Sequence, residues 1–185
     1  YTAPAIYSGG GSSDVLINRR PLDFWDLQLV LNLFSQSGDH WLRFFDAAGL
    51  TDLGRGRYTD WAAFRAAIYY PYDWLQTMAF YDFANMGLPT FVPGSPMYLL
   101  NTGTNAPDEW IVSLWQPPLE VYPYNYTDCR WFAGTYFWWG LTDFRLLPGV
   151  STFESVAELF AVLSSEPELR RLSGELTQSR LQRSA

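Results

Sequence analysis

The chain contains no lysine, and all twelve basic residues among its 185 are arginine. It therefore cannot form a Schiff base on a lysine, and it cannot place the lysine of a P-loop on a phosphate. Its formal net charge is -7 at pH 7. An acidic chain without a basic stripe binds duplex nucleic acid poorly, because contacts to phosphates supply much of that binding free energy. We expect no nucleic-acid partner.

Cysteine and histidine are almost absent, since Cys129 and His40 are the only residues of their kinds. A single cysteine excludes an internal disulfide, and this composition excludes zinc sites built from several cysteines or histidines. A Ser-His-Asp triad would depend on His40 alone, and no serine stands in the pattern of a nucleophile elbow. We expect His40 to cap a helix or to lie at the edge of the core, and we expect no metal site.

Long apolar runs without interruption are also missing. Residues 83–107 carry no charge, but Gly87, Pro89 and Pro93, followed by further glycines and prolines, interrupt them. A membrane-spanning helix needs about 20 consecutive apolar residues. We expect no transmembrane segment.

Aromatic residues, in contrast, are abundant, with nine Trp, twelve Tyr and thirteen Phe. One small core cannot enclose so many rings, so this excess favours a ligand cleft or a surface that faces a partner. The densest run lies at residues 131–139. We expect some of its rings to face a second domain or a larger assembly.

The composition along the chain predicts one α/β domain between two terminal segments. Residues 1–20 are interpreted as a flexible tether, because Gly9, Gly10 and Gly11 precede two serines. The start has no initiator Met and no basic, apolar leader, so we expect the chain to begin inside a longer protein or after removal of a leader. Residues 21–165 are predicted to form the domain, and residues 166–185 a C-terminal helix with arginines near its end.

Hydrophobic spacing and capping residues predict the elements of this domain. A strand, a helix and a second strand follow one another between residues 67 and 92, which is typical of a parallel α/β unit. Residues 130–139 fit a helix or a strand equally well. The expected helices cover residues 21–37, 39–46, 60–66, 78–86, 97–100, 108–114, 156–163 and 166–185, and the expected strands cover residues 67–70, 88–92 and 144–147.

Residues 81–93 read Tyr-Asp-Phe-Ala-Asn-Met-Gly-Leu-Pro-Thr-Phe-Val-Pro. This segment resembles the carboxyl-terminal half of glycosyltransferases that consist of two facing Rossmann-like domains, the GT-B fold. In that family an acidic residue stands five positions before a glycine that ends a helix, and x-Pro and a buried strand follow. Residues 139–155 are similar to the closing strand and helix of the same half-domain, as found in algae. The resemblance covers roughly residues 66–165 and implies a Rossmann-like half-domain with a small parallel sheet flanked by helices.

The resemblance also implies the residues of a nucleotide-sugar site. Asp82 stands where the family usually has a glutamate that holds the ribose. Thr77 and Arg130 are expected near the diphosphate, and Asp73 is adjacent to the family's second acidic position, which Trp74 occupies here. Arg65 and Arg145 are further candidates for the diphosphate, whereas the lysine that the retaining members pair with an arginine is missing.

Two functions are consistent with these residues. The first is the donor-binding half of a glycosyltransferase, which would have a nucleotide sugar as substrate, a second Rossmann-like domain as partner, and the secretory pathway as its location. The second is a non-catalytic interaction subunit of a larger assembly in an organelle, built on the same scaffold. The segment from Asp82 to Pro93 favours the first function, and the missing lysine and the short length favour the second.

Overall fold

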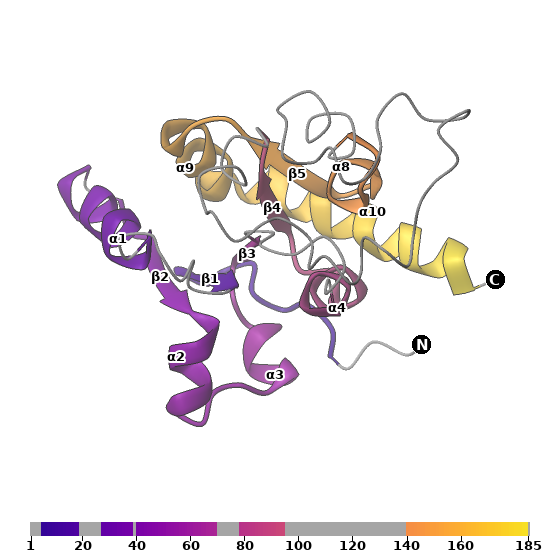
Figure 1. The fold of residues 1–185 in the computed structure, drawn as a ribbon, viewed down its shortest axis with the longest axis horizontal. Coiled ribbons are helices and arrows are strands. Elements are labelled where there is room, and N and C mark those ends of the chain that lie inside the picture. Colours follow the sequence, from indigo (N-terminus) through magenta and orange to yellow (C-terminus); the bar gives the residue numbers. More distant parts are fainter. Residues whose placement is uncertain (1–4, 19–26, 39, 70–77, 95–139, 185) are drawn as a thin grey trace, which may run out of the picture.

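The computed structural model describes residues 5–18, 27–38, 40–69, 78–94 and 140–184 (Figure 1). They form a five-stranded parallel sheet with helices on both faces, which is a Rossmann-like α/β arrangement. The predicted fold class is therefore confirmed. The expected helices at residues 97–100 and 108–114 and the aromatic run at 131–139 lie outside the described residues.

The strands of the sheet stand in the order β2-β1-β3-β4-β5, and every neighbouring pair is parallel. Two of them, β3 and β4, were predicted, and Ala67 lies opposite Thr90 in their register, as Ile68 does opposite Phe91. Both strands are buried along their whole length, as central strands of parallel sheets are. The strands are β1 (Asp14–Asn18), β2 (Arg43–Asp46), β3 (Ala66–Tyr69), β4 (Thr90–Pro93) and β5 (Val150–Phe153).

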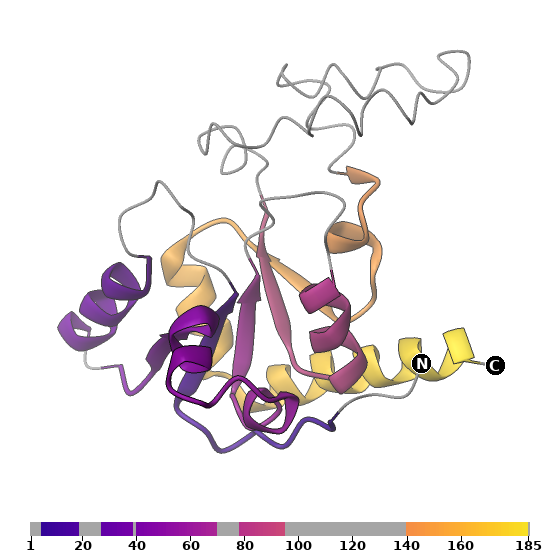
Figure 2. The same cartoon turned by 60° about the horizontal axis from the view of Figure 1, so that its bottom comes forward.

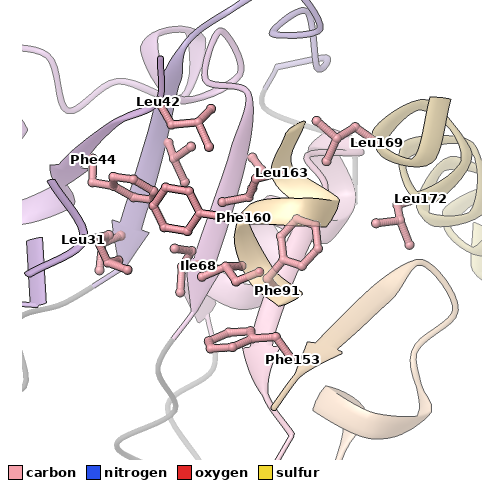
Figure 3. Packing of buried hydrophobic residues seen from close by; sticks show 14 residues of the cluster. Leu31, Leu42, Phe44, Ile68, Phe91, Phe153, Phe160, Leu163, Leu169 and Leu172 are labelled. Atoms are coloured by element: carbon pink, nitrogen blue, oxygen red, sulfur yellow. The ribbon is translucent and has the colours of Figure 1, made fainter. Parts of the chain in front are cut away.

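Two hydrophobic clusters lie on opposite faces of the sheet, because successive side chains of a strand point to opposite sides. Leu16, Ala67 and Val92 belong to the first cluster, and Ile17 and Ile68 belong to the second. Figure 3 shows the second cluster, in which Phe160 lies between the strands and the helices. The first face is covered by α2 (Ala47–Asp52), α3 (Tyr58–Trp61), α4 (Met78–Met86) and α8 (Asp143–Leu146), and the second by α1 (Leu27–Ser37), α9 (Val156–Ser164) and the start of α10 (Glu166–Ser184).

Helix ends were predicted best where the residue that stops or caps the helix stands directly beside it in the sequence. The bounds of α4 agree with the prediction, and Gly87 follows it with φ 74°. Ser155 caps α9 by accepting a hydrogen bond from the Glu158 backbone N at 3.2 Å. The first helix ends at Ser37 as expected, and the part of it predicted before Leu27 lies outside the described residues.

The prediction of a flexible tether over residues 1–20 is wrong for Asp14–Asn18, which form the inner strand β1. Val15 and Leu16 are fully buried. Gly9 lies directly against the backbone, since a Cβ built on it would come within 1.7 Å of the Phe64 carbonyl oxygen. A strand buried on both faces has no polar alternation, so the short run was not recognised behind the glycines.

Three further element predictions are wrong. Residues 43–46 form β2 rather than the end of a helix, because Phe44 and Phe45 enter the clusters on opposite faces of the sheet. Residues 143–146 form the helical turn α8 rather than a strand, and β5 follows it at Val150–Phe153. The helix expected at 60–66 is the shorter α3, and Ala66 already belongs to β3.

The last helix is part of the domain and not a separate segment. Leu169, Leu172 and Leu176 are buried, whereas Leu181, which continues the predicted stripe, is 59% exposed. Figure 2 shows α10 passing across the ends of the strands toward α4. The described helices include none that is long and apolar enough to cross a membrane.

Candidate functional site

The strand order reverses between β1 and β3, because the chain runs from β1 to β2 on one side and from β3 to β4 and β5 on the other. Open parallel sheets bind ligands beyond the carboxyl ends of their strands at such a reversal. At this point the last residue of β1, Asn18, lies opposite the last residue of β3, Tyr69. We call the carboxyl ends of β1, β2 and β3 the carboxyl edge, and it is the candidate site.

Two buried polar side chains end neighbouring strands at the carboxyl edge. Asn18 is 8% exposed and ends β1, and Asp46 is 5% exposed and ends β2. Parallel pairing places Asp46 beside Ile17, one position from Asn18. The edge thus carries an amide and a carboxylate, which are groups able to orient a polar ligand. Neither residue was predicted as part of a site, because a polar residue that ends a strand is recognised only when the ends of β1 and β2 are known.

Three aromatic rings in mutual contact fix the elements beside the carboxyl end of β3. The Tyr69 ring lies 5.5 Å from the Phe144 ring and 5.4 Å from the Phe80 ring, measured between centroids. Phe80 and Phe144 contact each other edge to face at 4.8 Å. Tyr81, next to Phe80, donates its hydroxyl to the Asp143 carboxylate. These contacts hold the first turns of α4 and α8 together next to the edge.

Asp82 lies on α4 and is 8% exposed, so it is a buried carboxylate and not one on the solvated face of the helix. Its Oδ2 accepts a hydrogen bond from the Tyr58 hydroxyl at 2.9 Å. The bond places Asp82 on the flank of α4 that faces α3, where Trp61 also contacts Phe83 edge to face. Asp82 is one turn, about 6 Å, along α4 from Met78.

Tyr58 is the partner of Asp82 and was not recognised in the sequence. The hydrogen bond to the Asp82 carboxylate, together with burial and the charge of Asp82, raises the pKa of the Tyr58 phenol. Tyr58 therefore keeps its proton at neutral pH and remains a donor. Tyr58 as a whole is 39% exposed, so the pair can be reached from the Tyr58 side. No sequence signal marked it, because it stands 24 residues from Asp82 and before the helix expected at residues 60–66.

The other predicted site residues are not assembled around Asp82 in the part of the chain that the structure describes. Thr77, Asp73 and Arg130 lie outside the described residues. Arg145 is exposed on α8. Arg65 precedes β3, at the opposite edge of the sheet, and donates to the Leu163 carbonyl oxygen at 2.6 Å. Its prediction as a diphosphate partner at the carboxyl edge is therefore wrong.

His40 lies at the edge of the core, as predicted. Its ring stacks with Phe34 at 6.2 Å and contacts Phe160 at 4.8 Å. Within the described ranges no group of three or more His, Cys, Asp or Glu side chains could hold a metal ion.

The fold and the reversal of strand order define a Rossmann-like α/β protein. Comparison with known proteins gave no matching family model, no matching curated protein and no matching solved structure.

Proposed function

We propose that the chain binds a nucleotide sugar at the carboxyl edge, as the donor-binding half of a GT-B-type glycosyltransferase. The observation that carries this proposal is the buried Asp82 carboxylate on α4, the helix that follows β3 at the reversal of strand order. Asp82 also occupies the position that the resemblance assigns to the acid that holds the ribose.

The chemistry of α4 supports this assignment. Because β3 and β4 are parallel, α4 runs back along the sheet and its amino end lies toward the carboxyl edge. A helix amino terminus attracts phosphate through its unpaired N–H groups and its dipole. The first turn of α4 carries no acidic residue that would weaken this attraction. One turn further on, Asp82 can exchange the Tyr58 hydroxyl for the hydroxyls of a ribose.

A second candidate function is the non-catalytic interaction subunit. The observation that favours it is the exposure of large apolar side chains on and next to α1. Leu33 is 54% exposed, Phe34 is 40% exposed and Trp41, just before β2, is 51% exposed. Large apolar groups that gather on a surface are typical of a contact with another protein.

Calorimetric titration with UDP, GDP and their sugars tests the first proposal. We expect Asp82→Asn to weaken nucleotide binding by about tenfold to a hundredfold, since it removes charge-assisted hydrogen bonds to the ribose. Tyr58→Phe is the matched control, because it removes the same Tyr58–Asp82 hydrogen bond and leaves the carboxylate in place. This variant should bind the nucleotide at least as well as the unchanged chain.

Equal affinities of the unchanged chain and Asp82→Asn would contradict the assignment of Asp82. The absence of heat from every nucleotide at millimolar concentration would contradict nucleotide binding itself. That result would favour the interaction subunit.

A further inference from the structure

A hollow of about 700 Å³ lies at the amino edge of the sheet, opposite the carboxyl edge. Gly10, Trp41 and Arg65 line it, and they precede β1, β2 and β3 respectively. Glu166 and Arg170 from the start of α10 complete the wall. The hollow is therefore separate from the proposed nucleotide site, and its properties are independent of that proposal.

Arg65 forms the floor of the hollow, and its side chain is only 3% exposed. Its Nε donates to the Leu163 carbonyl oxygen, and its Nη1 donates to the carbonyl oxygens of Gly10 and Ser12 and to Glu166 Oε2 at 3.1–3.3 Å. Among the described residues its Nη2 has no hydrogen-bond partner, and it is not one of the atoms sealed from solvent without a partner. The Nη2 edge of this buried guanidinium is therefore the part that can donate to a ligand.

The charges around the hollow favour an anion. Glu166 lies 3.2 Å from both Arg65 Nη1 and Arg170 Nε, so one carboxylate is shared between two guanidinium groups. Two arginines against one glutamate leave one positive charge, in a chain whose formal net charge is -7. The side chain of Arg170 is 76% exposed, so it can turn from Glu166 toward a ligand without leaving solvent. Guanidinium groups bind the oxygens of phosphates and carboxylates in a matching planar geometry.

An aromatic wall adjoins this positive charge. The guanidinium carbon of Arg65 lies 4.5 Å from the centroid of the Trp41 ring, and Trp41 is still 51% exposed. Trp41 is thus held in place by a cation–π contact while it offers ring surface to the hollow. Gly10 and Gly11 also line the hollow, and their backbone N–H groups donate to no acceptor among the described residues.

We propose that this hollow is a binding site for a small aromatic ligand that carries a phosphate or carboxylate group. The oxyanion lies against Arg65 Nη2 and Arg170, and the ring of the ligand lies on Trp41. The site needs both parts, because neither the single net charge nor the one aromatic ring provides much affinity alone.

Amide and indole ¹H–¹⁵N spectra during titration with phenyl phosphate and with benzoate test this site. Phenol, which has the ring without the anion, and inorganic phosphate, which has the anion without the ring, are the matched probes. We expect either aromatic anion to shift the signals of Gly10, Gly11 and the Trp41 indole at lower concentration than both matched probes. Whichever of phenyl phosphate and benzoate binds more tightly shows whether the site prefers a phosphate or a carboxylate.

Arg170→Gln should weaken this binding by about threefold to tenfold, as the loss of an exposed charge-assisted contact does. Arg183→Gln removes the same charge from the far end of α10 and should leave the affinity unchanged. Equal affinities of these two variants would overturn the proposal. Equal binding of phenol and phenyl phosphate, or the absence of shifts at Gly10 and Gly11, would overturn it as well.

Discussion

At the scale of single residues, Arg65 connects segments that are far apart in the sequence. Its hydrogen bonds reach Leu163 and Glu166, which stand 98 and 101 residues away, as well as Gly10 and Ser12 before β1. Burying a guanidinium is costly unless its donors find acceptors, and here three carbonyl oxygens and a carboxylate accept hydrogen bonds from Nε and Nη1. Arg65 therefore holds the start of α10 and the segment before β1 against the sheet.

We expect Arg65→Gln to lower the free energy of unfolding by about 3 kcal/mol, because glutamine leaves buried acceptors without a donor. Arg170→Gln is the control, since it removes an equal charge that also contacts Glu166 but is 76% exposed. Its effect should stay below about 1 kcal/mol. Urea unfolding followed by circular dichroism measures both values. If both variants lost similar free energies of unfolding, the burial of Arg65 would not determine how much it contributes to stability.

Tyr7 provides a prediction on alkaline stability. Its hydroxyl donates to the Arg65 carbonyl oxygen, and burial, followed by the charge of Glu166, raises the pKa of Tyr7 from 10.0 to about 12. Between these values the unfolded chain loses the Tyr7 proton while the folded chain keeps it. The folded state then binds more protons, so its stability is complete below pH 10 and falls as the pH rises toward 12.

We expect the free energy of unfolding to fall less steeply across this window in Tyr7→Phe than in the unchanged chain. The other tyrosines titrate in both proteins, so the difference between the two curves isolates Tyr7. Urea unfolding at several pH values within the window measures it. Parallel curves for the two proteins would contradict the raised pKa.

At the scale of elements, α1 closes the outer side of β2, which is the last strand at one end of the described sheet. The Asn32 side chain donates to the Phe44 carbonyl oxygen and accepts from the Phe44 backbone N, both at 3.1 Å. The Ser35 hydroxyl bonds to the Leu42 carbonyl oxygen at 2.7 Å. Side chains of a helix thus occupy backbone groups that an open strand would offer to another chain.

Asn32→Leu should lower the free energy of unfolding by about 1–3 kcal/mol, because both backbone groups of Phe44 lose their partner. It should also increase self-association, since the edge of β2 becomes available for pairing. Gln36→Leu is the matched control, because it places the same apolar residue on an exposed position of α1. Urea unfolding and sedimentation velocity measure the two effects. An unchanged stability of Asn32→Leu, or equal effects of both variants, would contradict this role.

The elements also show how far the sequence determines the structure. The ends of α4 and α9 were predictable, because Gly87 and Ser155 act on residues within one turn. The strands β1, β2 and β5 were missed, because short buried strands are distinguished only by partners elsewhere in the chain. The residues of the candidate site were likewise predictable only where the pattern is local in the sequence. Asp82 was found from the pattern that follows it, whereas its partner Tyr58 comes from a separate helix.

At the scale of the whole molecule, the parallel sheet has two chemically different edges. The carboxyl edge carries Asn18 and Asp46 and lies near the amino end of α4. The amino edge carries Arg65 and the hollow beside Trp41. Parallel strands produce this separation, because all amino ends meet at one edge and all carboxyl ends at the other. A ligand can therefore be assigned to one of the two sites by which edge contains the residues whose NMR signals shift on binding.

A nucleotide site at the carboxyl edge can be tested by titrating the ¹⁵N-labelled chain with a UDP-sugar and recording ¹H–¹⁵N spectra. The titration is carried out on Arg170→Gln, so that binding at the amino edge is weakened. Binding at the carboxyl edge should shift the amide signals of Asn18, Tyr69 and Asp82 and leave the signal of Gly10 nearly constant. Shifts confined to the amino edge, or none at millimolar nucleotide sugar, would contradict a nucleotide site at the carboxyl edge.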